Sequence, residues 1–507
     1  MVRRARVALI AASATLAVVS AACGGSSGGS KPTIHSFTAT PGTLPYGGGQ
    51  VSFTWSVTGA SRLDLEPGVG LVSGTGATVA VGSSSTWTLT ATNSHGVVTA
   101  KTSINVATSM TVSGRVVSYG TPAGHVVHVL GQGTAPALTD TNGAFSIDGV
   151  VPPYDIAALY INGQTVAIVW RGLTRPDPTL ESPNAIFLSA FDNGSVSGTV
   201  ATAAGFPEAP GALTRIGLSG GHMIRNSTSA DTTTSAWSSG DFWFGPSAIS
   251  LHVHAIEGQG DPANPGRPTS FLRAGSTTAT LANGAAVSGV DIPMSPISTG
   301  TITGVVTTAA GFAHPSVTEQ VVFAPAGIGG PAFDVGDAVV VSGMQCTNGS
   351  FSLAAPVIPG TTITLTGFDF GPGGISEASH SGLPANSSSA ALSFLPPPVI
   401  ELPTAGAIVG PGTIFAWTGT PGAVSETMIV GPGYQVAVIG TANEMTVPDL
   451  GEVGVSMPAN ASMFWFPIEV GPFTSMDEAT GPAGILAPPA AQSFVLEGNS
   501  QGFTSAP

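Results

Sequence analysis

Two histidines separated by a single residue form a pattern that could bind a metal ion. His252 and His254 belong to a stretch in which apolar and polar residues alternate, so both imidazoles would project from one face of a β-strand. Zinc needs three or four protein ligands, and the neighbouring candidates His222, Asp241 and Glu257 cannot be placed from the sequence. We therefore interpret the pair as two exposed strand histidines, and we expect neither a metal nor another cofactor.

A second pattern, at residues 217–221, fits the G-x-S-x-G signature of a hydrolase nucleophile elbow centred on Ser219. That chemistry needs the serine on a strained turn between a strand and a helix, with an acid and a histidine further along the chain. The Ser- and Thr-rich residues 226–239 do not favour such a helix, and a chain with 69 glycines produces the pattern by chance. We expect Ser219 to lie in a loop.

Other residues with reactive or ligating side chains do not complete a known site. His125 and His128 would point to opposite faces of a strand. Residues 140–143 begin like a calcium loop but lack a third oxygen ligand and the bidentate glutamate, so a hairpin turn explains them better. Cys346 is expected to be buried as a small apolar residue. Without a phosphate-binding loop, a dinucleotide fingerprint or paired carboxylates, the sequence predicts no catalytic residues and a protein that is not an enzyme.

The elements that hold these residues are predicted to be β-strands. Charged residues make up 8% of the chain against a usual ~25%, and 69 glycines and 41 prolines interrupt it throughout. No long run suited to a helix occurs after residue 22. The hydrophobic content of 42% argues against disorder. Because 507 residues exceed what one core supports, we predict an all-β fold of tandem β-sandwich modules.

The acidic balance of the chain argues against one class of partner. The net charge is −15, and the basic residues are too few to form the cluster that contacts with a phosphate backbone require. We therefore expect no nucleic-acid partner.

The N-terminus has the layout of an export signal. Residues 1–6 are basic, residues 7–19 are mostly apolar, and small residues precede Cys23. The apolar stretch is too short and too poor in large residues for a membrane span. We predict that residues 1–22 are a cleaved signal peptide.

The five residues that end at Cys23, Val-Ser-Ala-Ala-Cys, resemble the signal of bacterial lipoproteins, whose cysteine becomes the lipidated first residue of the mature chain. The resemblance implies a lipid anchor in a membrane, a Gly/Ser tether over residues 23–31 and a location at the cell envelope. Gly24 is compatible with sorting to the outer membrane. The family favours an aliphatic residue where this chain has Ser20, so simple secretion after cleavage behind Ala22 is the alternative.

Residues 32–107 have the strand pattern of a small sandwich. In residues 51–57, apolar side chains alternate with hydroxyls, which places Phe53 and Trp55 on a core face, and the strand that begins at Trp87 repeats the pattern. The segment resembles a bacterial immunoglobulin-like domain without the cysteine pair of antibody domains. The resemblance implies a spacer or a recognition module.

Three successive segments share a short opening motif and a later landmark in which a small residue and glycine precede an aromatic residue. Such turns predict β-hairpins. The units resemble the carboxypeptidase regulatory-like domain, a transthyretin-like sandwich that accompanies enzymes and surface proteins without supplying a catalytic centre. The predicted copies cover residues 108–193, 194–297 and 298–395, with openers at 112–117, 196–200 and 302–306 and landmarks at 142–146, 239–243 and 348–352.

A run of prolines at residues 396–398 begins the last module. Residues 414–417 and 463–468 are predicted core strands, and the segment 396–507 loosely resembles a fibronectin type III or immunoglobulin-like module followed by a tail. Because the openers recur and no cysteine pair links the modules, each module is expected to fold independently.

These features lead to three functional hypotheses. The first is a non-catalytic cell-surface lipoprotein that acts as a structural stalk or adhesion array, because a tether precedes a string of modules. The alternative is a protein that binds a glycan or another extracellular polymer, which exposed aromatic residues on one sandwich face would favour; a surface protein is a further possible ligand. A hydrolase that uses Ser219 ranks third.

The lipid anchor yields a direct prediction. Because each buried CH₂ contributes about 0.8 kcal/mol and lipoproteins carry a diacylglyceryl group, the acyl chains should hold the protein firmly in a membrane. Cys23→Ser should move it from the membrane fraction to the soluble fraction without unfolding modules that begin beyond Ser30. Detergent phase partition and mass spectrometry of the mature N-terminus measure this. An unmodified N-terminus at Cys23 in the aqueous phase would contradict the anchor and leave secretion.

Overall fold

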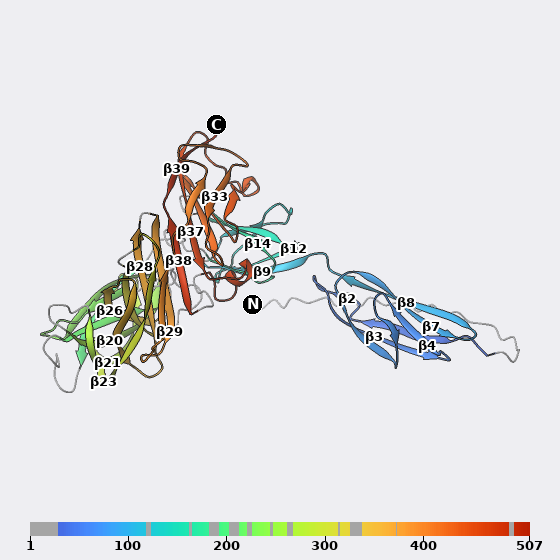
Figure 1. Ribbon diagram of the computed structural model, residues 1–507, viewed down its shortest axis with the longest axis horizontal. Helices are drawn as coiled ribbons and strands as arrows, with labels where there is room; N and C mark the ends of the chain where they lie inside the picture. Colours follow the sequence, from blue (N-terminus) through green and yellow to red (C-terminus); the bar gives the residue numbers. More distant parts are fainter. Residues whose placement is uncertain are drawn as a thin grey trace. The chain divides into compact units, whose positions relative to one another are not determined.

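The computed structural model consists of β-strands almost throughout (Figure 1). The fold class is therefore all-β, as the sequence predicts, with strands layered as β-sandwiches. In the described part of the chain, no helix is long and apolar enough to span a membrane. The structure describes residues 29–117, 123–161, 165–181, 192–201, 212–220, 226–243, 247–260, 267–312, 315–324, 337–371, 373–485 and 491–507.

The chain divides into two compact units, residues 1–108 and residues 109–507. The division falls next to the predicted end of the immunoglobulin-like module at residue 107.

The first unit is a sandwich of two mainly antiparallel sheets around a tryptophan-containing core. Val51, Phe53 and Trp55 are buried, whereas the hydroxyl residues between them are exposed, so the predicted inward face is confirmed. Trp87 reaches the same core from the other sheet, and its ring centroid lies 4.7 Å from that of Phe53. The sheet orders are β1 (Thr33–Thr40), β3 (Gly49–Thr58), β6 (Gly76–Val81), and β2 (Thr43–Leu44), β8 (Gly96–Val106), β7 (Ser85–Asn93), β4 (Arg62–Glu66), β5 (Gly70–Val72).

One long mixed sheet runs through the second unit. It joins strands from three of the predicted modules, because strands of residues 108–193, 396–507 and 298–395 follow one another across it. Its order is β11 (Ala137–Leu138), β10 (Val126–Val129), β13 (Tyr154–Ile161), β14 (Thr165–Leu173), β35 (Tyr434–Gly440), β34 (Val424–Gly431), β37 (Ser462–Gly471), β38 (Gln492–Gly498), β29 (Gly374–Leu383), β28 (Thr362–Gly371), β25 (Ser316–Ala324) and β26 (Asp337–Gln345).

The modules meet in this sheet at a parallel strand pair. Residues 165–170 of β14 pair in register with residues 434–439 of β35. Every residue from Val166 to Trp170 is buried, because both faces of β14 are covered. Ile168 and Trp170 face one core, and Ala167 and Val169 face another.

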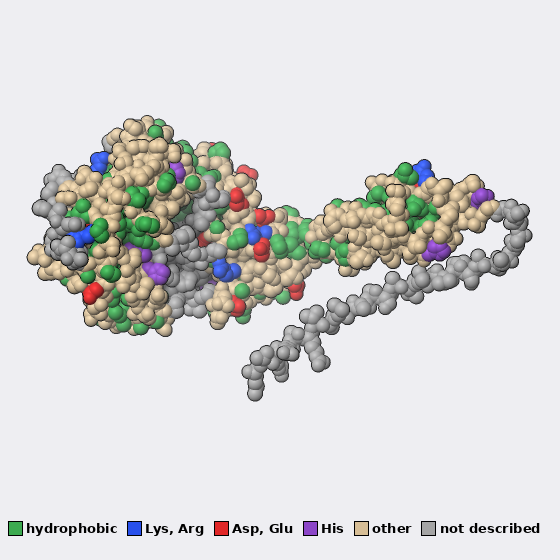
Figure 2. All heavy atoms as spheres, turned by 90° about the horizontal axis from the view of Figure 1, so that it is seen from below, with side chains coloured by type: hydrophobic (Ala, Val, Ile, Leu, Met, Phe, Trp, Pro, Cys, Tyr) green, Lys and Arg blue, Asp and Glu red, His purple; other side chains and the backbone are tan. Residues whose placement is uncertain are grey.

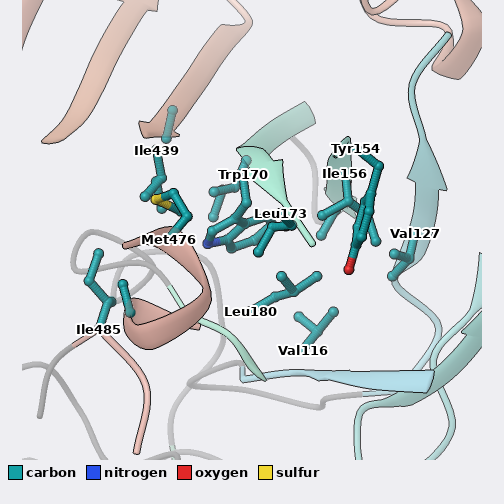
Figure 3. Packing of buried hydrophobic residues seen from close by; sticks show 14 of the residues in the cluster. Val116, Val127, Tyr154, Ile156, Trp170, Leu173, Leu180, Ile439, Met476 and Ile485 are labelled. Atoms are coloured by element: carbon teal, nitrogen blue, oxygen red, sulfur yellow. The ribbon is translucent and has the colours of Figure 1, made fainter. Parts of the chain in front are cut away.

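The predicted module at residues 108–193 does not have a core of its own. A short sheet covers its face of the long sheet, and Trp170 and Leu180 pack there with Ile439, Met476 and Ile485 from the C-terminal part of the chain (Figure 3). The core of residues 108–193 is therefore shared with the C-terminal part of the chain. The covering sheet has the order β12 (Ala144–Val150), β9 (Met110–Val116), β15 (Thr179–Leu180).

Further sheets complete the second unit. The sheet β27 (Gly349–Val357), β24 (Ser298–Thr308), β30 (Ala390–Phe394) closes a core with β25, β26 and β28, and β31 (Val399–Leu402), β33 (Ile414–Thr418), β36 (Glu444–Thr446) covers the C-terminal strands. Residues 192–296 supply a sheet with the order β18 (Asn226–Ser229), β17 (Ala212–Ser219), β20 (Ala248–Gly260), β21 (Pro268–Ala282), β23 (Ile292–Pro296), β16 (Asp192–Ala201) and β19 (Ala236–Trp243), with β22 (Ala286–Val287) beside β16.

The C-terminal residues, for which we expect a tail, form strands. β38 and β39 (Gln501–Ser505) both pair with β37, and β32 (Ile408–Val409) pairs with β39. A short helix, α1 (Met476–Ala479), and a 3-10 turn, η2 (Gly451–Val453), lie between the strands of this region.

The predicted hairpins at the three landmarks are wrong. The turns at residues 140–143 and 348–349 join strands that belong to different sheets, β11 to β12 and β26 to β27. Ser239 and Gly240 lie within β19 and not in a turn. A glycine turn reverses the chain, but the apolar face of the next strand decides which sheet that strand joins.

The shared core predicts that a mutation in residues 108–193 destabilises the whole second unit. Trp170 is 1% exposed, so Trp170→Ala should lower the free energy of unfolding of this unit by about 3–5 kcal/mol. Calorimetry should show a lower Tm for the larger transition only. Trp87→Ala is the matched control and should lower only the transition of the first unit. Separate transitions for residues 109–193 and 396–507 would contradict the shared core.

Candidate functional site

Ser219 does not lie on a nucleophile elbow. It is the last residue of β17, so the expected loop is wrong, and it is buried. The next described element is a strand and not a helix, since β18 runs back antiparallel along β17 with Asn226 opposite Leu218. Gly221 and His222 lie outside the described residues. The strand–turn–helix geometry that activates a serine is therefore not formed by the described residues around Ser219.

The two histidines of β20 have different surroundings. They share a face of the strand, as predicted, with ring centroids 6.4 Å apart. His252 is exposed, but His254 is buried, so the interpretation of two exposed histidines is wrong for His254. The ring of His254 stacks on Phe323 at a centroid distance of 3.8 Å, and its Nδ1 lies 2.7 Å from the Ser276 hydroxyl.

The proposed companion ligands do not gather around this pair. Glu257 projects from the other face of β20, where it is fully buried and forms an ion pair with Arg273 at 3.0 Å. Asp241 lies on β19 and accepts a hydrogen bond from Ser239. In the parts of the chain that the structure describes, no three His, Cys, Asp or Glu residues group as metal ligands.

The remaining sequence candidates have structural roles. His128 Nε2 lies 3.0 Å from a carboxylate oxygen of Glu452, and this hydrogen bond lowers the pKa of Glu452. Asp140 Oδ1 accepts hydrogen bonds from the backbone N–H groups of Asn142 and Ala144, as in a side-chain-capped turn. Cys346 is buried as expected, and burial raises the pKa of its thiol, which makes the thiol less reactive.

Two phenylalanines on β28 form an exposed group that the sequence analysis did not single out. Phe368 is 41% exposed and Phe370 is 67% exposed, and both lie on the face of the strand opposite to the core residues Ile363 and Leu365. Their ring centroids are 5.7 Å apart with an interplanar angle of 83°. On the face drawn in Figure 2, charged side chains are sparse, in line with the charged fraction of 8% in the sequence.

Carboxyl groups lie beside these rings. Glu377 is directly opposite Phe368 on β29, Ile375 is opposite Phe370, and Glu497 of β38 is opposite Ile375. Direct cross-strand neighbours share a sheet face, with Cβ atoms about 4.5–5.5 Å apart. Burial raises the pKa of both glutamates. We call Phe368, Phe370, Ile375, Glu377 and Glu497 the aromatic patch.

The sequence indicates only part of the patch, namely the two phenylalanines that lie close together in one strand. Residues 367–371 read Gly-Phe-Asp-Phe-Gly, so both aromatic side chains fall on one strand face. The sequence does not tell which face of the sheet is covered, and the glutamates come from other strands. Only the assembled sheet brings the rings and carboxyl groups together.

A shallow cleft lies where the start of β21 crosses β24 and β27. Its volume is about 460 Å³. Four of its nine lining residues carry hydroxyl groups, and the Thr299 hydroxyl already accepts the backbone N–H of Phe271 at 2.7 Å. Its polar lining residues are Arg267, Thr269, Thr299, Thr301 and Ser352.

Comparison with known proteins gives no family. No protein-family model matches the sequence. No curated protein matches it either.

Solved structures show only remote likeness. A leucine-rich repeat protein from Bacteroides thetaiotaomicron is 12% identical over 40% of this chain and 26% of its own, with a TM-score of 0.17. The shaft pilin SpaA from Lactobacillus rhamnosus GG is 10% identical over 41% of this chain and 98% of its own, with a TM-score of 0.13. Immunoglobulin domains 1–5 of Sidekick-1 are 8% identical over 94% and 99%, with a TM-score of 0.15. At these values, the strands of the chain itself define it as an all-β sandwich protein.

One buried carboxyl group has no counterpart in the sequence analysis. Glu319 lies on the core-facing side of β25 between Val317 and Val321, and it is 1% exposed. Neither of its carboxyl oxygens has a hydrogen-bond partner among the described residues. This burial raises the pKa of Glu319 to about 8, so the group is neutral at neutral pH.

Glu319 should make the second unit less stable as the pH rises. Between the ordinary glutamate pKa and about 8, the unfolded carboxyl is ionised while the folded one keeps its proton, so stability falls by about 1.4 kcal/mol per pH unit. Above that range, both states are ionised and this loss stops growing. Glu319→Gln should therefore gain stability over the wild type progressively from pH 5 to 8.

Chemical denaturation at several pH values measures this difference. Glu401→Gln is the matched control, because Glu401 is exposed on β31, and its stability should follow the wild type. A difference between wild type and Glu319→Gln that does not change with pH would contradict a neutral buried Glu319.

Proposed function

We propose that this chain is a non-catalytic structural or adhesion protein of the bacterial cell surface. The observation that carries the proposal is the continuous sheet of the second unit, which links strands more than 250 residues apart in the sequence through β14 and β35. Shared cores on both faces of that sheet make the unit a single stiff body. A stiff second unit that follows a separate small first unit in the chain is the arrangement expected of a scaffold that exposes a binding surface.

The positions and contacts of the candidate reactive residues support a non-catalytic role. Ser219 ends a strand, Glu257 is held by Arg273, and His254 is stacked against Phe323. Each of these side chains contributes to packing between strands. Ser219 lies directly opposite His252 in the pairing of β17 with β20, but the described residues around Ser219 do not form the strand–turn–helix geometry of a nucleophile elbow.

We place the protein at the cell envelope, held by lipid on Cys23. Cys23 and the residues before it lie outside the described part of the chain, and the lipoprotein-like signal supports this placement. The Gly/Ser tether at residues 24–30 would let the first unit stand away from the bilayer. The outer membrane is the favoured site because of Gly24, and secretion is the alternative.

A second candidate function is binding of a glycan or another extracellular polymer. The exposed rings of Phe368 and Phe370 favour it, because neighbouring exposed aromatic side chains on one sheet face are a feature of ligand-binding surfaces. A hydrolase that uses Ser219 is the least supported candidate.

The proposal predicts a loss of attachment without a loss of enzymatic activity. A strain without the chain should adhere less to surfaces or to other cells, and the wild-type gene should restore adhesion. Purified protein should not turn over ester, peptide or glycoside substrates, and Ser219→Ala should behave as wild type in both assays. Turnover that Ser219→Ala abolishes would replace the proposal with the hydrolase hypothesis, and unchanged adhesion of the deletion strain would remove the adhesive role.

A further inference from the structure

The two phenylalanines of the aromatic patch are exposed to solvent, and the core of the fold does not need aromatic side chains at these positions. The core of this region is built on the other face of β28, where Ile363 and Leu365 are fully buried. Two exposed phenylalanines keep apolar surface in water at a cost of roughly 25 cal/mol per Å². Folding alone therefore gives no reason for Phe368 and Phe370.

The ring geometry limits what can dock on the patch. With an interplanar angle of 83°, one ring stands nearly perpendicular to the other, so the two form a corner and not a flat platform. A flat crystalline polymer surface would meet only one of the two ring faces. A single sugar ring of a soluble chain can lay its apolar C–H face on one ring while its edge meets the other.

The polar groups of the patch match hydroxyl donors. Glu377 and Glu497 lie on the same sheet face as the rings, and a carboxyl group accepts hydrogen bonds from two neighbouring hydroxyls. The described cross-strand neighbours of the patch residues include no Lys or Arg, so the glutamates would disfavour an anionic sugar or a phosphate there. Partial burial strengthens hydrogen bonds to these carboxyl groups, because water competes less for them.

We propose that the aromatic patch of β28, β29 and β38 binds an uncharged sugar residue of a soluble glycan, with Phe368 and Phe370 against its C–H faces and Glu377 and Glu497 accepting its hydroxyls. This inference rests on the second candidate function and names its ligand class and site. Sugars offer adjacent apolar and hydroxyl surfaces in one ring. This is the combination that the patch complements.

The same sheet contains a matched control. Phe464 of β37 is 42% exposed and stacks on Phe466 with an interplanar angle of 11°. Its cross-strand neighbours are Val430 and Gly502, which offer no carboxyl group. Phe464 is therefore an exposed aromatic residue of equal size without hydroxyl acceptors beside it.

The experiment uses the full-length protein in detergent. An array of neutral and anionic glycans identifies neutral oligosaccharides that bind, and isothermal titration calorimetry then gives Kd for the best of them. Phe368→Ala and Phe370→Ala should each raise Kd at least tenfold, and Glu377→Gln should raise it several-fold. Phe464→Ala should leave Kd within a factor of two, and circular dichroism should show all variants folded.

Three results would overturn the inference. They are binding of no neutral glycan, a preference for anionic glycans, and a Kd unchanged by both phenylalanine variants. Concentration-dependent self-association that Phe370→Ala removes, without glycan binding, would assign the patch to contacts between copies. If Phe370→Ala restores adhesion to the deletion strain as well as wild type does, the adhesive function stands and this site does not carry it.

Discussion

The parallel pairing of β14 with β35 is the constraint on which the second unit depends. It joins the strands of residues 126–173, which end with β14 in the sheet order, to strands from the C-terminal region that begin with β35. Because β14 is covered on both faces, two separate cores meet at this one strand. The apolar face of the short sheet of β9, β12 and β15 packs in one core with β10, β13 and β14, and the pairing adds Ile439 and Met476 to that core.

Local patterns in the sequence predict local structure well. The alternation at Val51, Phe53 and Trp55 gives the inward face of β3 because a strand has a period of two. The pairing of β14 with β35 leaves no comparable pattern, since its partners are more than 250 residues apart. The unbroken apolar run at residues 166–170 is a hint, because strands buried on both faces read this way, but it does not name the partner.

At the candidate site, too, the sequence predicts the local arrangement of side chains but not the contacts that distant strands bring. The sequence places His252 and His254 on one face of a strand, but the burial of His254 depends on Phe323, which comes from another sheet. Phe368 and Phe370 are visible as a pair in the sequence, whereas the carboxyl groups beside them arrive by strand pairing. Glu319 breaks the apolar pattern of β25, and only the closed core reveals that it has no partner among the described residues.

The distance along the chain between β14 and β35 also has a consequence during biosynthesis. About 260 residues must follow Leu173 before Tyr434–Gly440 exists, which at bacterial translation speeds takes tens of seconds. Until then β14 is an apolar strand with an open edge, the kind of segment that aggregates. A chain that crosses a membrane from its N-terminus would present that edge on the far side while its partner strand is still being translated or translocated. The protein would therefore depend on export chaperones that shield the edge until β35 arrives.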